Sequence, residues 1–366
     1  MDRNVARTLV VWLALAAPIG FAPRGEGGEF RIERIFGPEV PTGRYKHPAS
    51  MTELKNGDFY LVYYGGEGEY ALDTGVFGSR LAKGAKTWTP PRRIAHDPFN
   101  SLGNAVVWEA PDGVVWLFYV VRYGPTWSNS RVAAKISRDG AATWSDASML
   151  VFEEGTLVRN RPLVLSTGEY LLPLYHETGD DQEFTGPGTY SFFLRYDPKT
   201  SKWTRSGPLH SPRGNEQPAP VELSPGNLVS YCRRSGDYRP ETIGHIVRSE
   251  SHDGGLTWAE GTDSPFPNPN AAVDLLKTRG GKLLLFFNDS MNSRTPLTVA
   301  LSPDLDRTWP IRRNIVEGPG DFAYPYAFQA SDGLIHVVYT SERRSVVNQA
   351  VFDEDWITNG PKRAEP

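Results

Sequence analysis

Cysteine is almost missing from the sequence, because Cys232 is the only one among 366 residues. No disulfide can therefore form within the chain, and its stability must come from the hydrophobic core. Metal-site patterns are missing too, since the seven histidines are scattered without the ligand spacing of a zinc centre. Apart from a stretch near the N-terminus, no segment is long and apolar enough to cross a bilayer. The sequence thus argues against a disulfide scaffold, a metal centre and a membrane span in the mature chain.

A surplus of positive charge is also missing. The chain carries 39 Lys and Arg residues against 43 Asp and Glu residues, which gives a formal net charge of −4. A general nucleic-acid-binding protein would normally show a basic surplus, so we expect no nucleic-acid partner. This balance still allows a small basic pocket for an anionic ligand.

Long helical periodicity is missing after the first residues, whereas turn-forming and aromatic residues are abundant. Aromatic residues make up 12% of the chain, and 36 Gly and 30 Pro residues are spread along it. Many aromatics separated by evenly scattered turn formers are typical of short strands joined by tight turns. The length does not require two domains, because all-β folds often exceed the average domain size. We therefore expect one all-β domain.

The N-terminus has the pattern of a secretory signal. Arg3 and Arg7 precede an apolar stretch at residues 9–17, and Pro18 and small residues follow. A basic start, a short apolar run and small residues are typical of a segment that directs export. The sequence predicts a signal peptide at residues 1–22, with the cleavage position left open, and an exported protein that is periplasmic or secreted. An uncleaved membrane anchor is the alternative.

One unit recurs six times along the rest of the chain: an apolar strand, a tight turn with glycine, and a second strand rich in aromatic or branched residues. The glycines of these turns are Gly57, Gly113, Gly168, Gly226, Gly281 and Gly333. Their spacing of 52 to 58 residues fits one four-stranded blade per repeat. Each unit is also a hairpin signal by itself, because glycine adopts backbone angles that other residues resist.

A second repeat alternates with the first. The segments at 137–144 (SRDGAATW) and 251–258 (SHDGGLTW) are good copies of one turn, and 302–309 (SPDLDRTW) is a partial copy. Weaker copies end at Trp88 and Trp203. The aspartate can accept hydrogen bonds from turn amides, and the tryptophan can be buried between sheets. We interpret these residues as structural and expect them far from any substrate.

This paired turn resembles the Asp-box of the sialidase (neuraminidase) superfamily, and the chain is similar to its bacterial BNR-repeat branch. The resemblance implies an all-β, six-bladed β-propeller with four-stranded antiparallel blades at residues 28–360. It also implies an active site over the central channel. Asp-boxes alone say little about activity, because they also occur in lyases, other glycosidases and non-enzymatic propellers.

In a propeller, the innermost strand of each blade begins at the mouth of the channel, where its first residues face a bound ligand. Polar and ionisable residues gather at these strand starts and at the returning ends of the second strands. Several basic side chains over one channel would form a concave cationic site for an anionic ligand. The substrate-binding candidates are Lys46, His47, Asn104, Arg159, Arg161, His176, Arg233 and Arg294.

The resemblance also implies roles for individual residues. The segment at 215–233 resembles the strand pair that supplies a glutamate base and an arginine, which makes them Glu216 and Arg233. Arg294 corresponds to a further carboxylate-binding arginine, and Tyr324 corresponds to the nucleophile. A tyrosine nucleophile suits a substrate whose anomeric carbon carries a carboxylate, because a negatively charged Asp or Glu would be repelled. Without the family, Tyr324 could be a packed aromatic and Glu216 a solvated strand start.

The first blade departs from the family. Its Phe-Arg-Ile-Pro signature reads Tyr-Lys-His-Pro at 45–48, so Lys46 stands where an arginine is expected. Lysine supplies charge without the bidentate fork of arginine, which would alter carboxylate recognition. For the catalytic acid we favour Asp73, and Glu67 and Glu69 are rivals. In the third blade, His176 and Glu177 could contact the substrate or donate a proton.

These observations predict an exo-acting retaining glycoside hydrolase that releases terminal sialic acid or a related acidic sugar, without a cofactor. A polysaccharide lyase acting on uronic acids is the first alternative, in which His47, His176 and Tyr324 would supply the reacting groups. A non-catalytic glycan-binding propeller is the second. An acidic glycan is the expected partner in each case.

Overall fold

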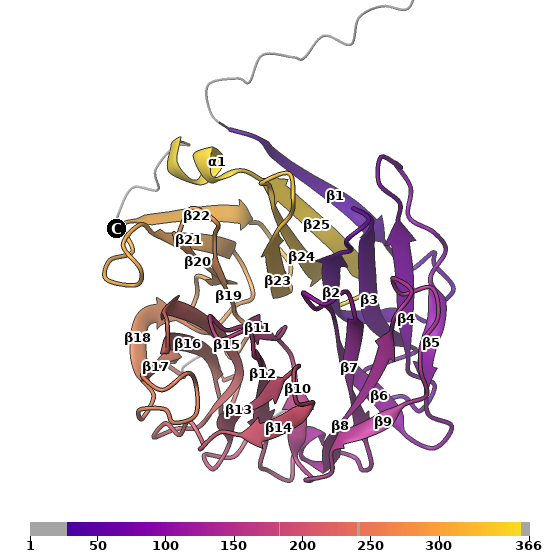
Figure 1. Ribbon diagram of the computed structural model, residues 1–366, viewed down its shortest axis with the longest axis horizontal. Helices are drawn as coiled ribbons and strands as arrows, with labels where there is room; N and C mark the ends of the chain where they lie inside the picture. The colour runs from indigo at the N-terminus through magenta and orange to yellow at the C-terminus, as the bar shows by residue number, and fades with distance from the viewer. Residues whose placement is uncertain (1–27, 183, 240–241, 360–366) are drawn as a thin grey trace, which may run out of the picture.

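The computed structural model describes residues 28–182, 184–239 and 242–359. Six antiparallel sheets are arranged around a common centre, as Figure 1 shows. The predicted six-bladed β-propeller is thus confirmed. Residues 1–22, predicted as a signal peptide, lie outside the described residues, so that prediction and the export that it implies stay predictions.

The first three blades follow one another along the chain. The first blade contains β2 (Tyr45–Glu53), β3 (Phe59–Gly66), β4 (Gly75–Leu81) and β5 (Arg92–His96). The second contains β6 (Ser101–Glu109), β7 (Val115–Arg122), β8 (Ser130–Ser137) and β9 (Ser148–Val151). The third contains β10 (Thr156–Val158), β11 (Leu163–Val164), β12 (Tyr170–His176), β13 (Tyr190–Asp197) and β14 (Lys202–Arg205). Its innermost strand is interrupted, because β10 and β11 pair with different parts of β12.

The last three blades complete the ring. The fourth blade contains β15 (Asn215–Ser224), β16 (Asn227–Arg234), β17 (His245–Ser251) and β18 (Thr262–Pro267). The fifth contains β19 (Asp274–Lys277), β20 (Leu283–Asn288), β21 (Leu297–Ser302) and β22 (Ile311–Val316). The sixth contains β23 (Ala323–Gln329), β24 (Ile335–Ser341), β25 (Val346–Phe352) and β1 (Phe30–Phe36). The described part of the chain also contains the short helices η1 (Trp127–Asn129) and α1 (Glu354–Asn359).

The ring is closed by strands from both ends of the chain. The first strand, β1, is the outer strand of the sixth blade and pairs with β25, so that Phe30 lies opposite Phe352. Figure 1 shows this indigo strand beside the yellow end of the chain. In α1, Trp356 stacks on Phe30 with ring centroids 4.3 Å apart. Because one blade needs both ends of the described chain, neither end can separate without exposing the sixth sheet.

The six repeated glycines lie in the turns between the first and second strands of the blades. All six have a positive φ, from 77° at Gly226 to 94° at Gly333. Side chains with a Cβ rarely adopt this conformation, which explains why the repeat places glycine there.

The second repeat forms the turns between the third and fourth strands. In the fourth blade, Asp253 accepts hydrogen bonds from the backbone amides of Leu256 and Thr257, at 3.0 and 2.9 Å. The adjacent Trp258 stacks on Phe193 of the third blade at 4.4 Å. Because strands alternate in direction, these turns lie at the end of each blade away from the starts of the innermost strands. Their structural role agrees with the interpretation from the sequence.

The innermost strands contact one another around the channel. Ser50 of β2 donates a hydrogen bond to the carbonyl of Ala105 in β6 at 3.0 Å. Tyr326 of β23 reaches across to the carbonyl of Val107 at 3.2 Å. These contacts make one ring of backbone on which residues from different blades can face a common pocket. In the described part of the chain, neither helix has the length and apolarity needed to span a membrane.

Candidate active site

The mouth of the channel repeats one unusual backbone feature. Four non-glycine residues at or just before the starts of innermost strands have positive φ: Asn104 (40°), Gln217 (53°), Asn270 (58°) and Tyr324 (58°). Three of them lie at strand bulges, in β6, β15 and β23. A bulge redirects a side chain, and strained backbone gathers where function requires it. The four residues therefore mark this end of the channel as the candidate site.

A pocket at this mouth draws on five blades and on loops between their strands. Its lining residues are His47, Tyr64, Glu69, Asn104, Trp127, Tyr175, Glu177, Gln182, Thr185, Glu216, Gln217, Arg233, Tyr238, Tyr324 and Arg344. Of the residues predicted from the sequence, His47, Asn104, Glu216, Arg233 and Tyr324 are in this set. These five come from four different blades, and the structure brings them together.

Tyr324 lies at the centre of the polar contacts and is 9% exposed. Its hydroxyl accepts a hydrogen bond from Nη1 of Arg233 at 2.8 Å and one from Nε2 of Gln217 at 3.4 Å. The imidazole of His47 meets its ring edge-on, with centroids 4.2 Å apart. These contacts fix the position of the Tyr324 hydroxyl among the groups that line the pocket.

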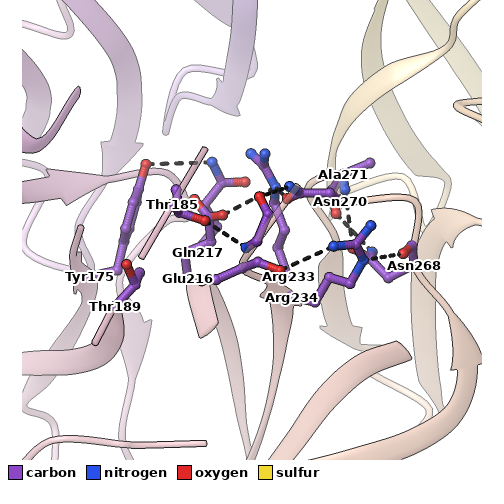
Figure 2. A network of polar contacts seen from close by, with 12 residues as sticks. Tyr175, Thr185, Thr189, Glu216, Gln217, Arg233, Arg234, Asn268, Asn270 and Ala271 are labelled. Carbon is purple, nitrogen blue, oxygen red and sulfur yellow. Dashed lines mark hydrogen bonds and ion pairs between the residues drawn. The ribbon is translucent and has the colours of Figure 1, made fainter. Parts of the chain in front are cut away.

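Arg233 connects several of these groups. Its Nε donates to Oδ1 of Asn270 at 2.7 Å and lies 3.5 Å from Oε1 of Glu216. Its Nη2 donates to the hydroxyl of Tyr238. Figure 2 shows Arg233 reaching Asn270 beside Glu216, while Gln217 reaches Tyr175 on the other side. One guanidinium thus joins a tyrosine, a carboxylate and a second tyrosine.

Glu216 is a buried carboxylate with unused hydrogen-bonding capacity. Its residue is 1% exposed, and Oε1 accepts no hydrogen bond among the described residues. Burial raises the pKa of Glu216, although the charges of Arg233, Arg234 and Arg294 oppose the rise. A buried carboxyl with a raised pKa can hold a proton more readily than a solvated one. Glu216 is therefore a buried ionisable group of the pocket with an acceptor oxygen that is free within the described part of the chain.

Arginines surround the ring of Tyr324. The guanidinium carbons of Arg159 and Arg294 lie 5.1 and 5.5 Å from its centroid. Arg159 is buried and donates to the backbone carbonyls of Tyr324 and Pro325 at 2.9 and 3.0 Å. Through these two bonds it holds the strained backbone of β23, and neither Arg159 nor Arg294, both predicted to bind substrate, is among the residues that line the pocket. Arg294 donates to the carbonyl of Asn270 at 3.2 Å and lies beside the rings of Tyr324 and Tyr238.

The first blade presents different residues from those that the sequence suggested. Lys46 is fully buried, and its Nζ donates to the carbonyl of Gly43 at 2.5 Å. Burial lowers the pKa of Lys46. A bulge between Lys46 and Ala49 interrupts the alternation of β2, and His47 lines the pocket instead. Lys46 is therefore not brought to the pocket.

The candidate acids of the first blade separate in the same way. Asp73 is exposed, and both of its carboxylate oxygens accept a hydrogen bond from the backbone amide of Glu67 at 3.2 Å. Neither Asp73 nor Glu67 lines the pocket, whereas Glu69 does. The loop after β3 therefore offers Glu69, not the favoured Asp73, to a ligand in this pocket.

Two candidates from the third blade also lie elsewhere. Arg161 pairs with Asp274 at 2.9 Å, so its charge is used between blades. His176 stacks on Tyr190 at 5.1 Å and lies outside the pocket, while the next residue, Glu177, lines it. Consecutive residues of an extended segment face opposite sides, which explains why Glu177 lines the pocket and His176 does not.

Of the other pocket residues, Glu177 was expected from the sequence to contact the substrate or donate a proton, whereas Tyr175, Tyr238 and Arg344 had no assigned role. Tyr175 is the next-to-last residue of β12, and Arg233 occupies the corresponding position of β16. That repeat position could have indicated Tyr175. Tyr238 and Arg344 lie in loops that the repeat does not cover, so no sequence signal pointed to them. Among the described residues, no group of three or more His, Cys, Asp or Glu side chains could hold a metal ion.

Comparison with known proteins agrees with this architecture. The chain matches the family model of the BNR repeat-like domain over residues 57–337. No curated protein matches the sequence. The structure is similar to a Hadza microbial sialidase, with a TM-score of 0.72 and 17% identity over 87% of this chain and 68% of that chain.

Two other solved structures cover nearly the whole of their own chains. The intramolecular trans-sialidase from Ruminococcus gnavus aligns with a TM-score of 0.69 and 15% identity, over 89% of this chain and 98% of that one. A protein of unknown function from Dyadobacter fermentans aligns with a TM-score of 0.72 and 16% identity, over 88% and 99%. At such identities the likeness concerns the fold.

Proposed function

Because the chain belongs to the BNR repeat-like domain family of the sialidase superfamily, and its pocket joins a tyrosine to a buried glutamate through one arginine, we propose that it is an exo-acting retaining glycoside hydrolase. The substrate is a glycan that ends in an acidic sugar, with sialic acid as the first choice. We further propose that the protein is exported, in keeping with its N-terminal pattern.

The observation that carries the proposal is the set of contacts made by Arg233. Its guanidinium lies 2.8 Å from the hydroxyl of Tyr324 and 3.5 Å from the carboxylate of Glu216. The cation stabilises the phenolate that forms during attack, and Glu216 accepts the phenol proton. A neutral nucleophile suits a sugar that carries a carboxylate beside the reacting carbon, because that carboxylate would repel an anionic nucleophile.

The reaction has two steps with balanced proton transfers. Tyr324 Oη bonds to the anomeric carbon as the bond to the leaving oxygen breaks, and a carboxylic acid protonates that oxygen. Water then cleaves the glycosyl-tyrosine, the resulting carboxylate takes the proton of the water, and Glu216 returns a proton to Tyr324. Two successive inversions retain the configuration of the sugar.

For the carboxylic acid we propose Glu177. Glu69 and Glu177 are the carboxyl groups that line the pocket besides Glu216, whereas Asp73 is exposed and bonded to the backbone of its own loop. Glu69 forms an ion pair with Arg344, to which we assign it. Glu177 is 6% exposed and acts electrostatically on Tyr175, whose hydroxyl accepts a hydrogen bond from Gln217.

The test is turnover of a fluorogenic sialoside by wild type, Tyr324→Phe and Tyr326→Phe. We expect Tyr324→Phe to lower kcat by roughly a thousandfold or more, because it removes the nucleophile. Tyr326→Phe is the matched control: Tyr326 lies two residues along β23, is buried, and does not line the candidate pocket. Unchanged turnover in Tyr324→Phe would refute the role of Tyr324 as nucleophile.

In the same assay, Glu177→Gln should lower kcat more for substrates with poor leaving groups than for substrates with good ones.

A lyase acting on uronic acids is the second candidate, and His47 is the observation that favours it. Burial, together with Arg344, Arg294, Arg159 and Arg233, lowers the pKa of His47 well below 6.5. A neutral imidazole beside Tyr324 could remove a proton from a uronate. His176, the other expected member, lies outside the pocket. The test is incubation with uronate polymers. Formation of an unsaturated product that absorbs in the near ultraviolet, together with no turnover of the sialoside, would identify the protein as a lyase.

A further inference from the structure

Arg344 enters the pocket from the turn between β24 and β25. Glu342, Arg343 and Arg344 all have positive φ, at 52°, 54° and 66°. Left-handed conformation is unfavourable for residues with a Cβ, so three in succession form a strained turn. The carbonyl of Arg344 accepts a hydrogen bond from the amide of Lys46 at 2.8 Å, which ties this turn to the first blade. The result is a cation from the sixth blade on the side of the pocket formed by the first.

The side chain of Arg344 is held by two groups of the first blade. Its Nη1 donates to the hydroxyl of Tyr45 at 3.1 Å and pairs with the carboxylate of Glu69. Both hydrogen bonds leave from Nη1, and within residues 28–182, 184–239 and 242–359 no acceptor bonds to Nε or Nη2. The planar fork of an arginine therefore keeps donors that a ligand carboxylate can use.

The position of the pair makes it accessible from the pocket. The side chains of Arg344 and Glu69 are 23% and 19% exposed, and both residues line the pocket. Arg344 also acts electrostatically on Tyr324 and His47. In contrast, the buried Lys46 uses its ammonium on a backbone carbonyl. The accessible cation on this side of the pocket is therefore Arg344.

We infer that Arg344 binds the carboxylate of the acidic sugar on the first-blade side of the pocket, and that Glu69 tunes this interaction by partly neutralising Arg344. The inference rests on the proposed function for the identity of the ligand. It assigns to Arg344 the contact that the sequence suggested for Lys46. A carboxylate on the ligand gains from the guanidinium and is opposed by the carboxylate of Glu69.

The experiment compares two probes by isothermal titration calorimetry: N-acetylneuraminic acid and its methyl ester, which lacks the negative charge. In wild type the acid should bind more tightly than the ester. Arg344→Gln should lower the affinity for the acid by roughly tenfold or more and leave the affinity for the ester nearly unchanged, as expected for a bond between charged groups. Glu69→Gln should raise the affinity for the acid severalfold, because it removes the competing negative charge.

Arg343→Gln is the matched control, since Arg343 is the exposed neighbour of Arg344 and does not line the pocket. It should leave both affinities unchanged, as should Lys46→Met. The inference is overturned if Arg344→Gln and Arg343→Gln act alike, if the acid and ester lose affinity equally, or if wild type binds no acid. If Arg344→Gln does not fold, Arg344→Lys, which keeps the charge without the fork, and Glu69→Gln decide the matter.

Failure of the inference can be told apart from failure of the proposed function. The inference alone is overturned if the protein hydrolyses the fluorogenic sialoside and its preference for the acid over the ester is the same in wild type and Arg344→Gln. Acid binding that depends on Arg344, without any turnover, overturns the hydrolase alone and leaves a sugar-acid-binding site.

Discussion

The fourth blade carries two carboxylates at its opposite ends, and their surroundings differ completely. Asp253, in the turn between β17 and β18, accepts hydrogen bonds from Ser251 and Thr257 side chains at 2.9 and 2.6 Å as well as from backbone amides. Glu216, at the start of β15, has an oxygen that accepts none among the described residues. The pKa of Asp253 is lowered, because these bonds outweigh its slight burial, whereas burial raises the pKa of Glu216.

This contrast separates structure from chemistry within one sheet. A carboxylate whose oxygens accept hydrogen bonds from a turn stabilises that turn. A buried carboxylate without them costs free energy, and such groups persist where a reaction needs a proton acceptor. The group that we propose for proton transfer, Glu216, is thus the one whose hydrogen bonds are incomplete.

The largest effect that would test this contrast is on catalysis. Glu216→Gln keeps the size of the side chain but cannot accept a proton. We expect kcat on the fluorogenic sialoside to fall by roughly a hundred- to ten-thousandfold, the usual contribution of a general base. Thermal unfolding should show an unchanged or higher midpoint, since a buried ionisable group is removed. Normal kcat with a lower midpoint would assign Glu216 to the fold.

The same chemical change at the other end of the blade should have the opposite result. Asp253→Asn replaces an acceptor oxygen with a donor amide that faces the hydroxyl of Thr257. We expect the free energy of unfolding, measured by chemical denaturation, to fall by about 1 kcal/mol, the usual net contribution of a hydrogen bond, because Asp253 is exposed. The kcat of the folded protein should stay the same. A large loss of kcat at full stability would show that the Asp-box communicates with the pocket.

The smallest effect is the pH dependence of these two stability changes. The folded pKa of Asp253 lies below 3.8, so its stabilisation is present above pH 3.8 and is lost as pH falls through the folded value. The folded pKa of Glu216 lies above 4.5, so its contribution is favourable below pH 4.5 and is lost as pH rises through the folded value.

Denaturation series from pH 7 downwards measure both trends. The cost of Asp253→Asn relative to wild type should shrink toward acid pH, while any stability gain of Glu216→Gln should be largest at pH 7. Parallel curves for the two variants would contradict the difference in surroundings.

Much of the scaffold could be predicted from the sequence. The glycine spacing indicated six hairpins, and all six glycines have the positive φ that explains their recurrence. The Asp-box turns occur as expected, including the partial copy in which Asp304 accepts the amide of Thr308 at 2.8 Å. Local signals suffice for these features, because a tight turn imposes its requirements on a few adjacent residues.

The candidate site was predictable only in part. Glu216, Arg233 and Tyr324 lie together as the family resemblance implied. Lys46 and Asp73 do not join them, because a bulge and a loop hydrogen bond decide where these side chains point. A shift of one residue moves a strand side chain to the other face, and no residue type announces it.

The sequence by itself determined the six blades, the turns that connect their strands, and the three central residues of the pocket, because each depends on repeated local chemistry or on a matching motif. Only the tertiary structure decided that Arg344 and Glu69, 275 positions apart, would form a pair in that pocket. Ring closure brings the sixth blade against the first. The contacts across this junction join the two ends of the repeated sequence, and the spacing of the repeat does not indicate which residues meet there.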